Sequence, residues 1–187
     1  VVDCADGSRY RARFVVSTLP TTVLRDVVIT PALPALQAEA VRELPYRQST
    51  ALYFRPLEPY WEIDGRPEAM WSNGPVSKVM RRVNTEHDYL WVKLPGAADR
   101  AVAGLAMPDV VAYVEAELYR MRPSMKGRPR YIGPHSWSRD PFVRGVTAYR
   151  TPGQIRKYGH AFADPPRRTH FAAQPPHVVI ARRAGTI

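Results

Sequence analysis

The sequence predicts an α+β fold in which a mixed or antiparallel sheet is flanked by helices. Four short runs rich in β-branched and aromatic residues follow one another between residues 48 and 96, and each is closed by Gly, Pro or Asn. A longer stretch after Pro108 has apolar residues at helical spacing. The 19 Pro and 11 Gly residues indicate many loops between these elements.

The first 44 residues predict a hairpin, a strand and a helix. A DGS turn signal is followed by alternation from Arg9, which predicts the hairpin, and the apolar run that ends at Pro20 predicts a buried strand. Pro34 suits the first turn of a helix that we expect to end before Pro45. The apolar residues at helical spacing in that segment are Leu36, Ala40, Val41 and Leu44.

The middle of the chain predicts the sheet and a second helix. The four strand-like runs are QSTALYFRP, EAMWSNG, SKVMRRVN and DYLWVKLPG, which together predict an antiparallel sheet. After Pro108, the residues expected on the buried face of a helix are Val110, Val114, Leu118 and Met121. Residues 130–137 predict a further strand, and we expect no stable element after Phe171, because no helical period follows it.

Composition narrows the class of protein. A length of 187 residues fits one domain with a single core, and we expect no transmembrane segment because no apolar run approaches the roughly 20 residues that span a bilayer. The single cysteine, Cys4, favours a reducing compartment, hence a cytoplasmic protein with a buried or half-buried thiol. Because the chain begins on Val in what resembles the middle of a strand, we expect that an N-terminal part is missing.

The net charge of +10 admits a nucleic-acid partner, for which steep salt dependence of binding would be the signature. The arginines are spread along the chain with only three adjacent pairs, and no basic helix with interleaved aromatics is present. We therefore expect no specific nucleic-acid binding.

The sequence lacks the motifs of several common kinds of binding site and active site. No GxGxxG or GxxxxGK[ST] loop occurs, and the five histidines have no metal-ligand spacing, so we expect no metal site. Ser17 and Ser49 lack a GxSxG elbow. What remains is a set of aromatic residues, of which Trp137 and Tyr149 stand at the two ends of the segment WSRDPFVRGVTAYRTPG. Its Asp-Pro, Gly and Pro-Gly signals predict a bent connector of the kind that lines pockets.

The order of the motifs resembles the C-terminal part of the flavin-containing amine oxidases, the monoamine oxidase-like family. The matching stretches are ARFVVSTLPTTVL, ITPALPALQAEAVRELPY, LYFRPLEPYW, LWVKLPGAADRAVAGLAM, WSRDPFVRGVTAYRTPGQ and RRTHFAA. They occur in family order and at about family spacing, over roughly residues 1 to 173. Each motif is weak alone, and the resemblance rests on all six being collinear.

The resemblance implies a two-domain flavoenzyme with FAD as cofactor. Residues 1–30 would return to a FAD-binding α/β domain, 31–134 would form the substrate domain, and 135–173 would cross back beside the flavin. Residues 174–187 form an atypical tail for which we expect disorder. The tail lacks a helix-capping pattern after HFAA, and we interpret it as an out-of-frame or truncated end. The implied partners are a small-molecule amine or related substrate and molecular oxygen or another electron acceptor.

The resemblance also suggests cofactor contacts. The residues carried over are Leu19, Pro20, Trp137, Val146, Thr147, Tyr149, Phe171, Ala172 and Ala173. Val146 or Thr147 stands where the family has a flavin-facing tyrosine, and Tyr149 matches its second tyrosine. The family lysine that holds a water to the flavin falls on Ala51, counted without gaps from Trp61, so no catalytic residue is assigned.

The expected function is that of a fragment of a FAD-dependent oxidoreductase whose parent reaction transfers a hydride from a C–N or C–C bond of a small substrate to flavin. Because Ala51 cannot hold a water, a desaturase-like or protoporphyrinogen-oxidase-like flavoenzyme is the alternative within enzymes. A catalytically inactive, orphan substrate domain is the alternative from another class. Because the chain lacks a glycine-rich fingerprint, we expect the isolated chain to be incomplete as an enzyme.

Overall fold

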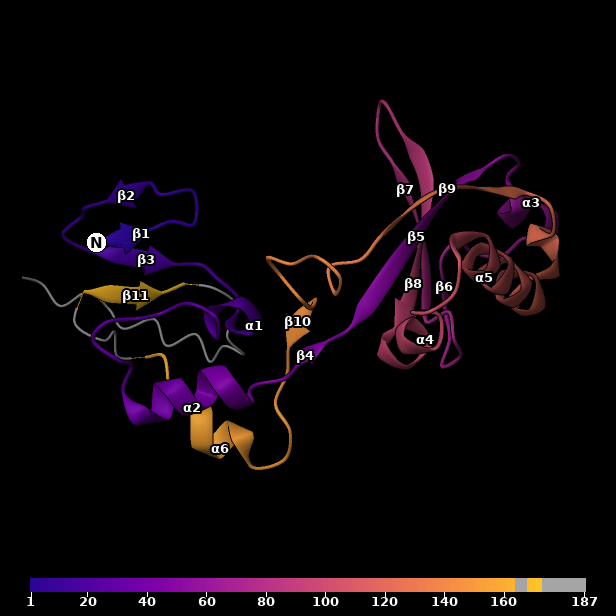
Figure 1. The fold of residues 1–187 in the computed structure, drawn as a ribbon. Helices are drawn as coiled ribbons and strands as arrows, with labels where there is room; N and C mark the ends of the chain where they lie inside the picture. Colours follow the sequence, from indigo (N-terminus) through magenta and orange to yellow (C-terminus); the bar gives the residue numbers. More distant parts are fainter. Residues whose placement is uncertain (164–167, 173–187) are drawn as a thin grey trace, which may run out of the picture. The chain divides into compact units, whose positions relative to one another are not determined.

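The computed structural model describes residues 1–163 and 168–172, which form two compact units (Figure 1). The first unit comprises Val1–Tyr46, Pro141–Val143 and the described residues from Thr147 onward. The second comprises Arg47–Asp140 and Arg144–Val146. Ala173 and the predicted tail, residues 174–187, lie outside the described residues.

The second unit is built on a five-stranded antiparallel sheet with the order β6-β7-β8-β5-β9. Its strands are β5 (Ser49–Pro56), β6 (Met70–Trp71), β7 (Lys78–Val83), β8 (Asp88–Pro95) and β9 (Pro129–His135). The four strands predicted between residues 48 and 96 are confirmed, as is the further strand predicted for residues 130–137. The result is a mixed α+β unit, as the sequence predicts.

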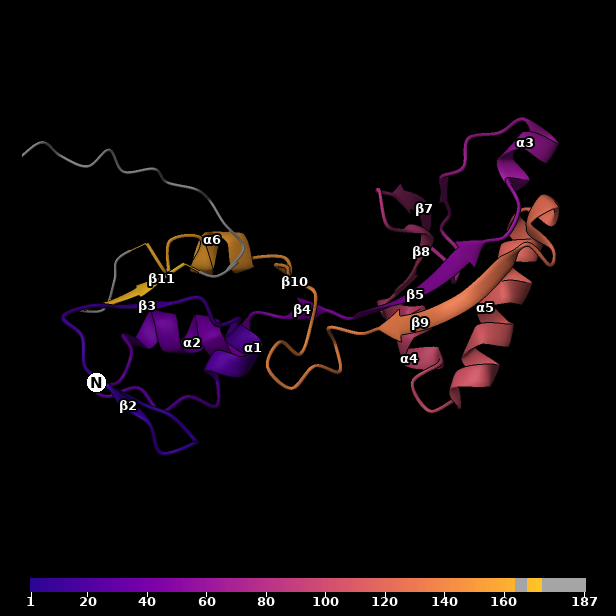
Figure 2. The same ribbon diagram turned by 90° about the horizontal axis from the view of Figure 1, so that it is seen from above.

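One face of this sheet carries the core of the second unit. The long helix α5 (Met107–Met121) lies alongside the sheet (Figure 2) and buries Val110, Val114 and Leu118, as its spacing predicts. They pack with Leu52 and Phe54 of β5 and with other apolar strand residues. Three short helical turns complete the unit: α3 (Tyr60–Asp64), α4 (Gly96–Ala101) and the 3₁₀ turn η1 (Pro123–Met125).

The first unit contains two separate strand ladders. β1 (Val2–Asp3) and β2 (Arg9–Tyr10) form the predicted antiparallel hairpin, whose turn has Gly7 at a φ of 85°. β3 (Val15–Ser17) pairs in parallel with β11 (Thr169–Phe171), which joins residues from the two ends of the described chain. Another short ladder joins β4 (Tyr46–Arg47) to β10 (Thr147–Ala148).

The helices of the first unit make a small core of their own. α2 (Ala35–Glu43) begins after Pro34 and ends before Pro45, as predicted, and it contacts α6 (Gln154–Tyr158). Ala40 and Leu44 pack there with Tyr158 and Ala161. The short helix α1 (Thr21–Leu24) is followed by Arg25, whose guanidinium donates hydrogen bonds to the carbonyls of Val41 and Leu44, at 2.8 and 2.7 Å.

Four sequence expectations are wrong. The expected single core is replaced by two clusters, because the apolar residues of the sheet and those of α2 and α6 gather separately. The strand that ends before Pro20 is not buried: Val16 is 62% exposed, since β3 pairs with β11 alone and a two-stranded ladder leaves its faces open. Cys4 is exposed in the hairpin turn, and Leu36 is exposed in the first turn of α2.

Candidate functional site

The sheet of the second unit has an open face opposite its core. Side chains alternate between the faces of a strand, and on β5 Leu52 and Phe54 are buried in the core, so Ala51, Tyr53 and Arg55 lie on the other side. Their cross-strand partners on β8 and β9 share that side. We define the open face by its strand residues, which are Ala51, Tyr53, Arg55, Trp71, Lys78, Met80, Arg82, Tyr89, Trp91, Lys93, Arg130, Gly133 and His135.

Aromatic rings wall a hollow on this open face. The hollow has a volume of about 230 Å³ and is lined by Tyr53, Arg82, Tyr89 and Trp91. The rings of Tyr53 and Tyr89 meet edge to face, with 5.5 Å between their centroids. Burial raises the pKa of the Tyr53 hydroxyl, and the neighbouring Tyr89 raises it further. The Tyr53 phenol therefore stays neutral at physiological pH and offers a hydrogen bond without charge.

Ala51, where the resemblance predicts a family lysine, lies in the same cross-strand row as two nitrogen-bearing side chains. It pairs with Lys93 on β8 and with His135 on β9. The His135 ring meets the Trp137 ring edge to face, with 4.3 Å between their centroids. A methyl side chain at position 51 can hold no water, so polar chemistry in this row depends on the neighbours of Ala51.

Hydrogen bonds fix the start of the bent connector to β5. The Ser138 hydroxyl accepts a hydrogen bond from the Ser49 amide at 2.8 Å. The Thr50 hydroxyl donates a hydrogen bond to the buried Asp99 carboxylate at 2.5 Å, and it is hydrogen-bonded to the Ser136 hydroxyl at 2.8 Å.

Within the second unit, backbone hydrogen bonds hold the start of the connector close to residues 145 and 146. The Gly145 amide donates to the Trp137 carbonyl at 3.0 Å, and the Val146 amide donates to the Arg47 carbonyl at 2.9 Å. Two of the predicted site residues, Trp137 and Val146, are thus near neighbours. The Trp137 side chain is 47% exposed.

The first unit brings another group of predicted residues together. Ser17 of β3 pairs with Phe171 of β11, and the Ala172 amide donates to the Ser17 carbonyl at 2.9 Å. Leu19 and Pro20 follow β3 directly, so the carboxyl ends of two parallel strands meet at four of the predicted residues. In open α/β sheets, ligands bind at the carboxyl ends of parallel strands.

Two hydroxyl groups at this strand end have no hydrogen-bond partner within the described part of the chain. The Ser17 Oγ and Thr21 Oγ1 atoms are buried, and Thr21 as a whole is 5% exposed. A buried hydroxyl without a partner is costly, so both groups are suited to polar atoms of a bound molecule.

The remaining predicted residues of this unit lie on and after β10. Thr147 belongs to β10, and the Tyr149 amide donates to the Pro45 carbonyl at 3.0 Å. Tyr149 is 38% exposed. The Tyr46 hydroxyl, on the strand paired with β10, accepts a hydrogen bond from the Thr21 amide at 3.3 Å. The β10 segment is therefore linked to the start of α1.

A larger hollow of the first unit lies at the opposite ends of the same strands. Its volume is about 740 Å³, and its lining includes Val15 and Thr169, the first residues of β3 and β11. None of the predicted site residues lines it. We assign the candidate contacts to the carboxyl ends, where the buried hydroxyls lie, and not to this hollow.

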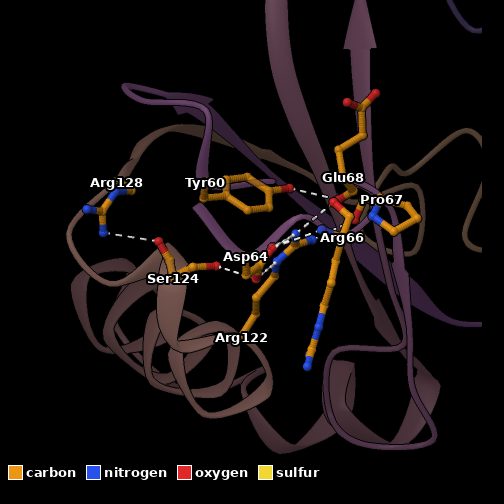
Figure 3. A network of polar contacts seen from close by, with 8 residues as sticks. All are labelled: Tyr60, Asp64, Arg66, Pro67, Glu68, Arg122, Ser124 and Arg128. Carbon is orange, nitrogen blue, oxygen red and sulfur yellow. Dashed lines mark hydrogen bonds and ion pairs between the residues drawn. The ribbon is translucent and has the colours of Figure 1, made fainter. Parts of the chain in front are cut away.

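Sequence reasoning missed a polar network around Arg122, shown in Figure 3. Arg122 is 3% exposed and donates two hydrogen bonds to the Asp64 carboxylate, at 2.8 and 2.5 Å, and others to the carbonyls of Arg66 and Pro67. Its guanidinium also lies 4.7 Å from the centre of the Tyr60 ring. Asp64 and Arg122 are 58 residues apart, so no local pattern signals the pair.

Ionisation in this network is fixed by its contacts. Hydrogen bonds from Arg122 and Ser124 hold the pKa of Asp64 far below its ordinary value. Burial raises the pKa of Tyr60 to about 12, and its hydroxyl donates to the Glu68 carbonyl at 2.8 Å. Since every group is satisfied by the protein itself, the network joins α3 to the end of α5 and we assign it a structural role.

A metal centre and a membrane-spanning helix are both absent from residues 1–163 and 168–172. No cluster of three His, Cys, Asp or Glu side chains there could hold a metal ion. The helices in these ranges are all too short or too polar to cross a bilayer.

The chain matches a known family over nearly all of its length. The family described as flavin containing amine oxidoreductase matches residues 1–181. The human peroxisomal N(1)-acetyl-spermine/spermidine oxidase is 28% identical over 173 residues, which cover 79% of this chain and 33% of that protein. The probable flavin-containing monoamine oxidase A of Dictyostelium discoideum is 24% identical over 179 residues, which cover 89% of this chain and 38% of that protein.

Solved structures share the fold. Cyclohexylamine oxidase from Brevibacterium oxydans IH-35A aligns with a TM-score of 0.77 and 20% identity, over 88% of this chain and 37% of that one. Wild-type putrescine oxidase bound to putrescine aligns with a TM-score of 0.73 and 19% identity, over 86% and 36%. The chain spans about a third of the length of the curated relatives that it matches.

Proposed function

The chain belongs to the flavin-containing amine oxidoreductase family, and on that premise we propose that it serves a FAD-dependent oxidoreductase. That enzyme would oxidise a C–N bond of a small substrate, with a hydride passing from the carbon of that bond to the flavin. Its relatives include proteins named as oxidases of acetylated polyamines, monoamines and putrescine. The second unit would be the substrate side and the first unit the cofactor side of that reaction.

The observation that carries this proposal is the meeting of β3 and β11. Leu19 and Pro20 lie after one strand, Phe171 and Ala172 at the end of the other, and the buried Ser17 hydroxyl has no described partner. These residues fit a ligand that has both a flat apolar part and hydrogen-bonding atoms. FAD is such a ligand, and it would supply the group that accepts the hydride.

The residues of this chain would act by binding and positioning. Ser17 and Thr21 would offer hydrogen bonds to the cofactor, while Leu19 and Phe171 would exclude water from it. Thr147 and Tyr149 of the same unit are proposed as further contacts, and the contacts predicted for Trp137 and Val146 of the second unit stay predictions. Excluding water strengthens the remaining electrostatic interactions and protects the reduced cofactor from side reactions.

Ala51 supports a second candidate reaction. A lysine that holds a water is absent at this position, and the adjacent open-face residues are Lys93 and His135. Oxidation of a C–C bond, as in a desaturase-like or protoporphyrinogen-oxidase-like enzyme, is therefore the alternative. Product analysis with amine and C–C substrates would separate the two reactions in a preparation that binds flavin.

Flavin binding by the purified 187-residue chain tests the proposal. We expect the visible absorbance of FAD to shift on binding, and the thermal midpoint to rise with FAD concentration, because a ligand stabilises the state that binds it. Ser17→Ala should weaken the FAD-dependent rise, since it removes the buried hydroxyl.

The matched control is Ser8→Ala. It removes a hydroxyl of the same unit that bonds to Asp6 in the hairpin turn, and it should leave the FAD effect unchanged. Absence of any spectral or thermal response to FAD, or equal losses in the two variants, would contradict the assignment of the cofactor to the ends of β3 and β11.

A further inference from the structure

The open face of the second unit's sheet carries positive charge without compensation. Its charged strand residues are Lys78, Arg82, Lys93, Arg55 and Arg130, with no Asp or Glu among them. Two of the cross-strand pairs are like-charged: Lys78 faces Lys93, and Arg55 faces Arg130. Like charges directly opposite each other destabilise a sheet, so the fold carries an electrostatic cost on this face.

The nearby carboxylates serve the other side of the sheet. Arg81 of β7 lies on the core side of the sheet, whereas Met80 and Arg82 on either side of it lie on the open face. The Arg81 guanidinium pairs with both oxygens of Asp88 at 2.8 Å. Glu68 lies 3.6 Å from the same guanidinium. Within the described ranges no carboxylate forms an ion pair with an open-face cation. The Lys78 ammonium instead lies over indole rings, 5.2 Å from the centre of Trp71 and 5.8 Å from that of Trp91.

The hollow on this face combines one of these cations with aromatic walls. Arg82 lines it together with Tyr53, Tyr89 and Trp91. Its volume of about 230 Å³ exceeds the roughly 150 Å³ of a cavity that accepts benzene. A phenyl-sized ring with a short chain would therefore fit, with the chain reaching the guanidinium.

We propose that this hollow binds a flat apolar ligand that carries a carboxylate, with the ring against Tyr53, Tyr89 and Trp91 and the carboxylate on the Arg82 guanidinium. The planar guanidinium can donate two parallel hydrogen bonds to a carboxylate. Lys78 and Lys93 add attraction, and the bound anion offsets their mutual repulsion. For a polyamine cation, every charged strand residue of this face is repulsive.

This inference rests on the proposed function for its biological meaning and deepens it. The substrate class becomes an amine that also bears a carboxylate and a flat apolar group, in place of the polyamines and diamines in the names of several relatives. Electrostatic selection of this kind acts through attraction of one ligand and repulsion of its competitor.

The test uses the indole N–H signals of the full chain labelled with ¹⁵N-tryptophan, which contains four tryptophans. Three probes are compared. 3-Phenylpropionate and 2-phenylethylamine share a phenyl ring and differ in the sign of their charge, and putrescine is a cation without a ring. We expect 3-phenylpropionate to shift the Trp91 signal at millimolar concentration and 2-phenylethylamine to bind about tenfold more weakly, a difference of about 1.4 kcal/mol. Trp61 is the internal control, because its ring lies under Arg81 on the core side.

Arg82→Gln tests the anion contact. We expect it to weaken 3-phenylpropionate about tenfold, to leave 2-phenylethylamine unchanged, and to keep the thermal midpoint, since Arg82 is exposed. Arg66→Gln is the matched control: it makes the same charge change in an exposed loop of the same unit, where the backbone of Arg66 joins the Arg122 network through its amide and its carbonyl.

Three outcomes would overturn the proposal: equal affinity for the anionic and cationic probes, a response at Trp61 in place of Trp91, or equal losses in the two variants. Tight oligothymidylate binding with displacement of 3-phenylpropionate would assign the face to nucleic acid instead. The titration needs no flavin. If the chain binds 3-phenylpropionate but not FAD, the proposed class of ligand for the hollow stands, and only the proposal that this ligand is the substrate of a flavoenzyme is refuted.

Discussion

The two units differ in how completely each buries its own apolar residues. In the second unit, a five-stranded sheet and α5 enclose Leu52, Phe54 and Leu118, all at 0% exposure. In the first unit, the ladders are two-stranded, and Phe14 just before β3 and Val16 within it are 52% and 62% exposed. Isolated two-stranded ladders are marginally stable in water, whereas three or more strands packed on a helix stand alone.

This difference separates the two kinds of candidate site. The open face of the second unit rests on a core that the unit supplies itself, so its geometry depends little on other molecules. The strand ends of the first unit hold exposed apolar side chains and buried hydroxyls without described partners. A bound molecule would therefore stabilise the first unit more than the second, and the following predictions test that contrast.

The largest effect is expected from a core truncation. Phe54→Ala should lower the free energy of unfolding of the second unit by about 4 kcal/mol, because it leaves a cavity among fully buried residues. Val16→Ala should change the first unit by less than about 0.5 kcal/mol, because that side chain is largely exposed. Equal effects would refute the contrast.

The measurement can be made specific to each unit. All four tryptophans, residues 61, 71, 91 and 137, lie in the second unit. Denaturant unfolding followed by tryptophan emission therefore reports on that unit. Hydrogen exchange of the β3 and β11 amides reports on the first.

The Arg122 network gives the next largest effect. Arg122→Ala should cost the second unit about 3 kcal/mol, because it removes a buried guanidinium, breaks its pair with the partly exposed Asp64 and leaves two carbonyls without donors. Arg120→Ala is the control, since its guanidinium is exposed and pairs with Glu117 one turn away. It should leave the tryptophan-monitored midpoint unchanged within error. A loss as large as that of Arg122→Ala would show that helix propensity or general charge, not the network, is measured.

The pH dependence of unfolding examines the same network. The Arg122 hydrogen bonds lower the folded-state pKa of Asp64 below its unfolded value, which is about 4. Asp64 therefore contributes stability above about pH 4, and that stability is lost as the pH falls further toward the folded-state pKa. Asp64→Asn should make the second unit less stable at pH 7 and flatten the loss of stability between pH 4 and 2. A slope equal to that of the wild type would contradict this linkage.

The sequence predicts the second unit well because its signals are local. Each of the four strand runs alternates or is closed by a turn residue, and Val110, Val114 and Leu118 mark a single helical face. The short helices α3 and α4 have too few residues to show a period. The β3–β11 ladder pairs residues more than 150 positions apart, and only the family resemblance relates the two segments.

The candidate sites divide in the same way. The resemblance predicts Leu19, Pro20, Phe171 and Ala172, and the structure brings their segments together, although their contact with flavin stays a prediction. The alternation in SKVMRRVN and DYLWVKLPG indicates on which face of its strand each of Lys78 and Lys93 lies. It does not show that the two lysines lie opposite each other, because alternation does not determine the register between strands.

The smallest effect, and the one with the most telling sign, concerns two serine hydroxyls. Ser49 Oγ donates to the Leu94 carbonyl at 2.8 Å, so Ser49→Ala should destabilise the second unit by about 1 kcal/mol. Ser17 Oγ is buried without a described partner, so Ser17→Ala should leave the first unit unchanged or stabilise it by up to about 1 kcal/mol in the absence of FAD. Hydrogen exchange of the Phe171 and Ala172 amides follows the first unit, and tryptophan emission follows the second. Opposite signs would indicate that the Ser17 site is shaped for a bound molecule and not for the fold, whereas destabilisation by both variants would remove the main support for a cofactor at the ends of β3 and β11.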